Sequence, residues 1–202
     1  MSGDIERSPE RDAALRAMLP HVAERGWTQT ALRDGLTEVG LNPDDARLLF
    51  PNGALDMVEA YADLADRRMA EAASDLPDRG VSRRVRAVIA LRLRQCGPER
   101  EAVRRALALL ALPGRAGTAA RITARTVDAI WHAAGDRSAD FSWYTKRAIL
   151  TGVYGATLLF WLRDWSEDDA ETLAFLDRRL AEVGRIGKLR GRLTGMWRPS
   201  TA

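Results

Sequence analysis

Few side chains in this sequence have the type and spacing that catalysis requires. The two histidines, His21 and His132, lie in separate predicted helices and lack carboxylate or thiol partners at the spacing of a metal site. Cys96 is the single cysteine, which excludes an intrachain disulfide and cysteine-based zinc sites. The sequence also lacks a nucleophile elbow, a phosphate-binding loop and a dinucleotide fingerprint. We therefore predict that the protein is not an enzyme, with no catalytic residue and no metal ion.

Positive charge is concentrated at the C-terminal end of the chain. The net charge is only +3, yet five basic side chains and no acidic one follow Val183. On a helical wheel an apolar arc is flanked by Arg185 and Arg192 on one side and by Arg190 on the other, a pattern that suits an anionic membrane surface. The predicted membrane-binding residues are Arg185, Ile186, Lys188, Leu189, Arg190, Arg192, Leu193, Met196 and Trp197. Four glycines on the polar side weaken the helix, so a frayed tail is the alternative.

A second distinctive segment runs from residue 128 to residue 147. It contains two helix ends joined by a short polar loop, in which Asp140 is a plausible cap for the following helix. Trp143 and Tyr144 are neighbours in that helix and point about 100° apart. One of them is therefore expected to face outward as a candidate interface anchor, with partial burial in the core as the alternative.

Helical periodicity recurs along the whole chain, and 46% apolar residues suffice for a globular core. We expect helices over residues 10–24, 28–39, 42–50, 55–69, 82–95, 99–112, 118–134, 141–163 and 167–197, the last with a break near 184–187. The expected organisation is a disordered N-terminus (1–9), a helix-turn-helix-like subdomain (10–70), a C-terminal helical domain (81–183) and the amphipathic tail (184–202).

The segment from residue 148 to residue 162 is apolar on every side but shorter than the ~20 residues needed to span a bilayer. We predict that it is the central buried helix. Its small residues, Gly152, Gly155 and Ala156, leave room either for a close helix crossing or for an apolar ligand.

The first 60 residues resemble the DNA-binding head of TetR repressors: a short helix, a glycine turn and a second short helix that ends at Leu49-Phe50-Pro51. Asp44 and Asp45 stand where that second helix would meet phosphates, and only Arg47 offsets them. We therefore expect no nucleic-acid partner. A TetR-type ligand-responsive regulator stays open as the alternative function.

Several longer motifs resemble the COQ9 family, accessory proteins of ubiquinone biosynthesis. The match extends from about Ala14 to Val183 and is most specific in the following segments: Leu19-Pro20-His21-Val22, Gly26-Trp27, the run from Ala106 to Pro113, and the run from Ala134 to Arg147. The resemblance implies an all-α, TetR-like helical bundle with a helix-turn-helix-like head and a larger C-terminal domain.

The same resemblance implies a homodimer that binds a polyprenylated quinone intermediate or a phospholipid, has no other cofactor and presents the lipid to a COQ7-type di-iron hydroxylase. The implied partner patch contains Asp128, Ile130, Asp140, Trp143 and Tyr144. We assign the lipid cavity to Leu110, Ile149, Tyr154, Leu158, Phe160 and Trp161. A lipid-modifying enzyme and a scaffold without lipid are further alternatives. The polar N-terminus leads us to expect a bacterial cytoplasmic protein, peripheral on the inner membrane.

Overall fold

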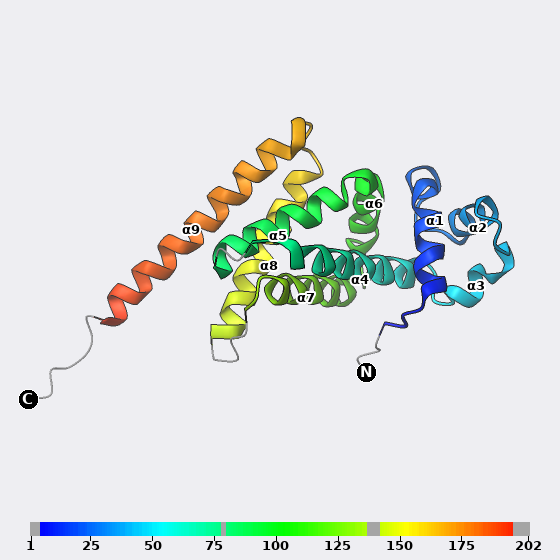
Figure 1. Cartoon of the computed structure of the whole chain (residues 1–202). Coiled ribbons are helices and arrows are strands. Elements are labelled where there is room, and N and C mark those ends of the chain that lie inside the picture. Colours follow the sequence, from blue (N-terminus) through cyan, green and yellow to red (C-terminus); the bar gives the residue numbers. More distant parts are fainter. Residues whose placement is uncertain (1–4, 78–79, 137–141, 196–202) are drawn as a thin grey trace, which may run out of the picture. The chain divides into compact units, whose positions relative to one another are not determined.

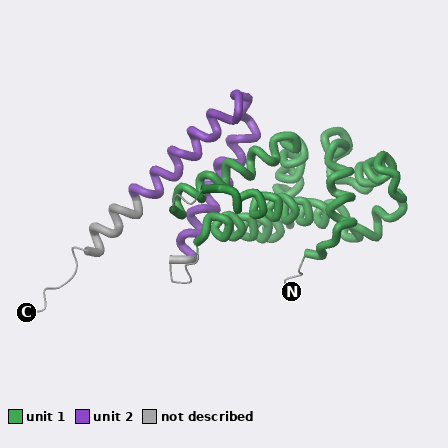
Figure 2. The backbone as a smooth tube through the Cα atoms, viewed as in Figure 1, with its two compact units in different colours: residues 1–137 green, residues 138–202 purple. Residues whose placement is uncertain are grey.

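The structure, a computed structural model, describes residues 5–77, 80–136 and 142–195, with side chains over 5–77, 80–136 and 144–185. The described residues form nine α-helices joined by short turns and four 3-10 helices, with no strand among them (Figure 1). This confirms the all-α prediction. The chain divides into two compact units, residues 1–137 and 138–202 (Figure 2). The subdomains expected from the sequence, 10–70 and 81–183, have different boundaries from these two units, and they remain a prediction.

The first three helices of unit 1 form the helix-turn-helix-like head. They are α1 (Pro9–Arg25), α2 (Gln29–Glu38) and, after a 3-10 turn at Pro43–Asp45, α3 (Ala46–Leu49). Side-chain oxygens cap the first two, since Ser8 accepts from the amide of Arg11 and Thr28 from the amide of Ala31. A Cβ at Gly35 would lie 2.4 Å from the Ala17 carbonyl oxygen, so α2 approaches α1 this closely only because residue 35 is glycine.

Residues 5–9 are more ordered than the sequence suggests, and residues 1–4 lie outside the described residues. Residues 1–9 are predicted to be disordered, whereas α1 begins at Pro9 and Arg7 pairs with Asp63 of the fourth helix at 2.6 Å. The charge pair supplies an anchor for residues 5–8 that composition alone does not reveal.

The rest of unit 1 is a bundle of four helices: α4 (Ala54–Ala72), α5 (Val81–Gln95), α6 (Arg100–Leu110) and α7 (Ala116–Ala133). Its core is formed by fully buried side chains that include Met57, Leu64, Met69, Ile89 and Ile130. A buried polar bridge also crosses this core. Asp66 of α4 lies 3.1 Å from Arg92 of α5 and accepts a 2.9 Å hydrogen bond from Thr126 of α7.

Unit 2 is a hairpin of α8 (Ser142–Trp161) and α9 (Ala170–Gly195), with a 3-10 turn at Glu167–Asp169 between them. Asp164 fixes the start of α9, because its carboxylate accepts from the amide and hydroxyl of both Ser166 and Thr172 at 2.6–2.8 Å. Phe160 and Phe175 stack across the hairpin with ring centroids 4.6 Å apart.

Helix α9 differs from the prediction in one respect. A break is expected near residues 184–187, but the helical backbone continues through them to Gly195. Isolated glycines weaken a helix by only about 1 kcal/mol each. No positive φ angle is recorded for the glycines of α9.

Candidate functional site

The predicted partner patch is only partly at the surface. Tyr144, near the start of α8, is 73% exposed and is the outward-facing aromatic that the sequence predicts, while Asp128 is half-buried. Ile130 is fully buried, so its place in the patch is wrong: it faces the helix bundle rather than a partner. The side chain of Trp143 and all of Asp140 lie outside the described residues.

The predicted lipid residues do not share one environment. Tyr154, Trp161 and Leu110 are buried, Leu158 and Phe160 are half-buried, and Ile149 is 41% exposed. The Trp161 indole donates to Asp169 at 3.1 Å, which ties this ring to the hairpin turn. A helix that is apolar on all sides predicts burial but not which residues face a cavity.

The small residues of α8 are not explained by close packing within unit 2. A Cβ built at Gly152 or Gly155 would meet nothing within 4 Å. The same outward face carries Tyr144 at one end and Leu159, which is 60% exposed, at the other. The close-crossing interpretation therefore finds no partner helix among the described residues.

The predicted membrane segment lies on the last turns of α9. Its backbone is helical from residue 185 to residue 195, and Arg185 is exposed. The side chains of Ile186, Lys188, Leu189, Arg190, Arg192 and Leu193, and the whole of Met196 and Trp197, lie outside the described residues. In the described part of the chain, no helix is long and apolar enough to cross a membrane.

The hairpin places two predicted surfaces toward the same end of unit 2. Because α8 and α9 are joined by a short turn after Trp161, the start of α8 and the end of α9 both lie away from that turn (Figure 1). At 1.5 Å per residue, the 26 residues of α9 extend about 39 Å and the 20 residues of α8 about 30 Å. Tyr144 and the backbone of the last turns of α9 therefore lie away from the turn, while Trp165, which is 87% exposed, lies at the turn.

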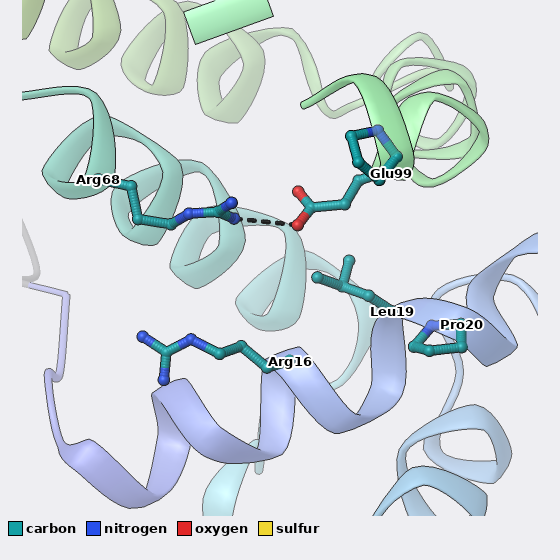
Figure 3. Close-up of a pocket in the computed structure, with 6 residues that line it drawn as sticks. Arg16, Leu19, Pro20, Arg68 and Glu99 are labelled. Atoms are coloured by element: carbon teal, nitrogen blue, oxygen red, sulfur yellow. Dashed lines mark hydrogen bonds and ion pairs between the residues drawn. The ribbon is translucent and has the colours of Figure 1, made fainter. Parts of the chain in front are cut away.

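Unit 1 contains a cavity that sequence reasoning missed. It has a volume of about 490 Å³ and is lined by Arg16, Leu19, Pro20, Arg68, Pro98 and Glu99 (Figure 3). Three of these residues lie on one face of α1, and none of the six predicted lipid residues lines it. Only the spacing 16, 19, 20 hints at a shared face in sequence, because the other walls come from distant elements.

An ion pair forms the wall of this cavity opposite α1. Arg68 donates to Glu99 at 2.9 Å, and the second carboxylate oxygen of Glu99 accepts from the Tyr61 hydroxyl at 2.7 Å. Burial would lower the pKa of Arg68, but the bond to Glu99 raises it above its ordinary value. Burial also raises the pKa of Tyr61, so this phenol stays neutral. Both oxygens of Glu99 are thus engaged within the protein.

The histidines have carboxylate neighbours that the sequence analysis overlooked. His21 Nε2 lies 3.2 Å from Glu38, and His132 Nδ1 lies 3.7 Å from Asp128. Over residues 5–77, 80–136 and 142–195, no group of three or more metal-ligating side chains comes together.

Comparison with known proteins finds similarity to one family. Residues 116–187 match the COQ9 family model. The chain is 32% identical over 200 residues to the mitochondrial ubiquinone biosynthesis protein COQ9 of Rattus norvegicus, covering 92% of this chain and 64% of that protein. The human protein of the same name is 32% identical over 181 residues, covering 86% and 57%. The chain thus spans about three fifths of the length of these relatives.

A solved structure supports the predicted architecture. The TetR transcriptional regulator from Nitrosomonas europaea superposes with a TM-score of 0.68 at 27% identity, over 87% of this chain and 98% of that one. This confirms the TetR-like fold.

The predicted location does not fit these relatives. A bacterial cytoplasmic location is wrong on this comparison, because the named relatives are eukaryotic proteins described as mitochondrial. The polar N-terminus was an insufficient basis for assigning a compartment.

Proposed function

This chain is a relative of the COQ9 proteins and carries their family domain over residues 116–187, and from that premise we propose that it is a non-catalytic accessory protein of ubiquinone biosynthesis. In this role it takes a polyprenylated quinone intermediate from the membrane surface and presents it to a COQ7-type hydroxylase. The observation that carries the proposal is the hairpin of unit 2, in which the exposed Tyr144 and the last turns of α9 both lie away from the α8–α9 turn.

This arrangement suits transfer of lipid at a membrane surface. Exposing an isoprenoid chain to water costs about 0.8 kcal/mol per CH₂, so free diffusion of such a lipid is strongly disfavoured. A protein that docks through the end of α9 and meets its partner at the start of α8 carries both contacts away from the α8–α9 turn. The apolar side chains of α8, among them Tyr154, Leu158 and Phe160, are the proposed lipid contacts.

The part of the outward face of α8 around Gly152, Gly155 and Leu159, away from Tyr144, is the proposed homodimer contact. Gly152 and Gly155 leave open space beside the helix, and Leu159 adds exposed apolar surface on the same face. Small residues let two helices approach closely, so this face supports packing against a second copy.

DNA binding is the less favoured alternative. Asp44 and Asp45 are exposed at the start of the segment that would contact DNA, and Arg33 of the head is paired with Asp44 at 2.8 Å. Leu48 in α3 is 80% exposed, where a DNA reader would carry polar or basic side chains.

The lipid proposal is tested by mass spectrometry of organic extracts from the purified chain. We expect an isoprenoid quinone intermediate or a phospholipid to be retained. Extracts from several preparations that contain no lipid would contradict lipid binding.

The presentation proposal is tested by binding to a COQ7-type hydroxylase. Replacing Tyr144 by Ala removes an exposed aromatic anchor and should weaken binding about tenfold, with the thermal midpoint unchanged. Trp165→Ala is the matched control, because this exposed aromatic lies at the opposite end of the hairpin. Equal loss in both variants, or no loss in Y144A, would contradict the proposed patch.

A further inference from the structure

The cavity of unit 1 is lined by one arginine, Arg16, that pairs with no described group. Arg16 is exposed and has no hydrogen-bond or ion-pair partner among the residues that the structure describes. The carboxylate nearest to it along α1, Asp12, is held by two hydrogen bonds from Arg67, at 2.7 and 2.9 Å. The charge of Arg16 is therefore available to a ligand.

The opposite wall cannot supply the missing negative charge. One carboxylate oxygen of Glu99 accepts from Arg68 and the other accepts from Tyr61, so the charge of Glu99 is balanced by Arg68. Arg16 and Arg68 together with Glu99 leave a net charge of +1 on the cavity walls. Guanidinium groups bind carboxylates and phosphates through directed, charge-assisted hydrogen bonds.

The remaining walls are apolar. Leu19 and Pro20 follow Arg16 on α1, opposite Glu99 (Figure 3). Pro98, the neighbour of Glu99 in sequence, also lines the cavity. The volume of about 490 Å³ lies within the range of small-molecule sites. A ligand that fills this space needs both an acidic group and an apolar body.

We propose that the cavity between Arg16, Leu19 and Pro20 of α1 and Arg68, Pro98 and Glu99 binds a small amphiphile with one negative charge. Its carboxylate or phosphate pairs with Arg16, and its apolar body lies against Leu19, Pro20 and Pro98. The site lies within unit 1 and does not depend on the lipid function proposed for unit 2.

Calorimetric titration of the full chain tests this site with three probes: octanoate, octanol and inorganic phosphate, each below any micelle-forming concentration. Octanoate should saturate a single site in unit 1, and octanol and phosphate should each bind at least fivefold more weakly. Arg16→Gln should weaken octanoate binding about fivefold without affecting octanol. Arg47→Gln, at an exposed arginine of α3, is the matched control and should leave octanoate binding unchanged.

Three outcomes would overturn the proposal. If octanol binds as tightly as octanoate, the negative charge of the ligand contributes nothing to binding. If phosphate binds as tightly as octanoate, the apolar wall contributes nothing. Octanoate binding that R16Q leaves unchanged would place the ligand elsewhere. Because Arg16 is exposed and unpaired, R16Q should fold normally, so a lost signal cannot be assigned to unfolding.

Discussion

Arg11 is the side chain on which the head of unit 1 most depends. It is 4% exposed, pairs with Asp56 at 2.6 Å, donates to the Leu49 carbonyl and lies over the Phe50 ring at 4.3 Å. Arg11→Met leaves Asp56 without its partner and should destabilise the protein by about 2–4 kcal/mol. Urea unfolding measures this as a lower midpoint at constant slope. Arg16→Met on the same helix should change stability by less than about 0.5 kcal/mol, and equal effects would contradict the role of Arg11.

Asp164 makes the stability of the hairpin depend on pH. Burial would raise the pKa of its carboxyl, but hydrogen bonds from Ser166 and Thr172 lower it to about 2. The stabilisation by the Asp164 carboxylate is complete above the pKa that this group has in the unfolded chain, ~4, and it is lost as the pH falls through the folded-state pKa of about 2.

We expect Asp164→Ala to destabilise the protein by about 2 kcal/mol at pH 7, where the Asp164 carboxylate of the wild type is charged in the folded and in the unfolded chain. The difference from wild type should shrink steadily between pH 4 and pH 2. Thermal unfolding of both proteins across this range provides the measurement. A difference that does not vary with pH would show that the carboxylate charge contributes nothing.

At the level of elements, Asp66 and Arg92 join α4 to α5 inside the bundle. Both side chains are buried, and burial raises the pKa of Asp66 despite the nearby cation. Arg92→Met leaves a buried carboxylate unpaired and should cost about 3–5 kcal/mol, whereas adding Asp66→Leu should recover at least half of that loss. Chemical unfolding of R92M, D66L and the double variant gives the free energies of unfolding for a double-mutant cycle. A double variant as unstable as the sum of its singles would show that the two groups are uncoupled.

The helices were predictable because their signals are local. Ser8, Thr28 and Asn42 cap the elements that the sequence places there, and periodicity located the cores of all nine helices. The start of α9 is set by a less local signal, because Asp164 makes most of the contacts there. Its oxygens reach eight residues along the chain, beyond the spacing of a simple capping box.

At the level of the molecule, the sites were less predictable than the fold. The family resemblance places Ile130 in the partner patch, yet its position on α7 directs its side chain into the core. The cavity of unit 1 combines α1 with residues 68, 98 and 99, which no local pattern connects. Tyr144 was correctly expected as a possible outward aromatic, because helix geometry alone separates it from Trp143.

The proposed membrane contact depends on where charge is carried, not on the net charge of +3. Cations near an anionic membrane contribute about 1 kcal/mol each, so replacing Arg185, Lys188, Arg190 and Arg192 by Gln should weaken binding to phosphatidylglycerol vesicles by roughly a hundredfold or more. The control replaces four exposed arginines elsewhere, Arg47, Arg83, Arg94 and Arg163, and reaches the same net charge. Vesicle flotation at low and high salt measures both proteins. If the two variants lose binding equally, the attraction comes from overall charge, and the end of α9 is not a docking segment.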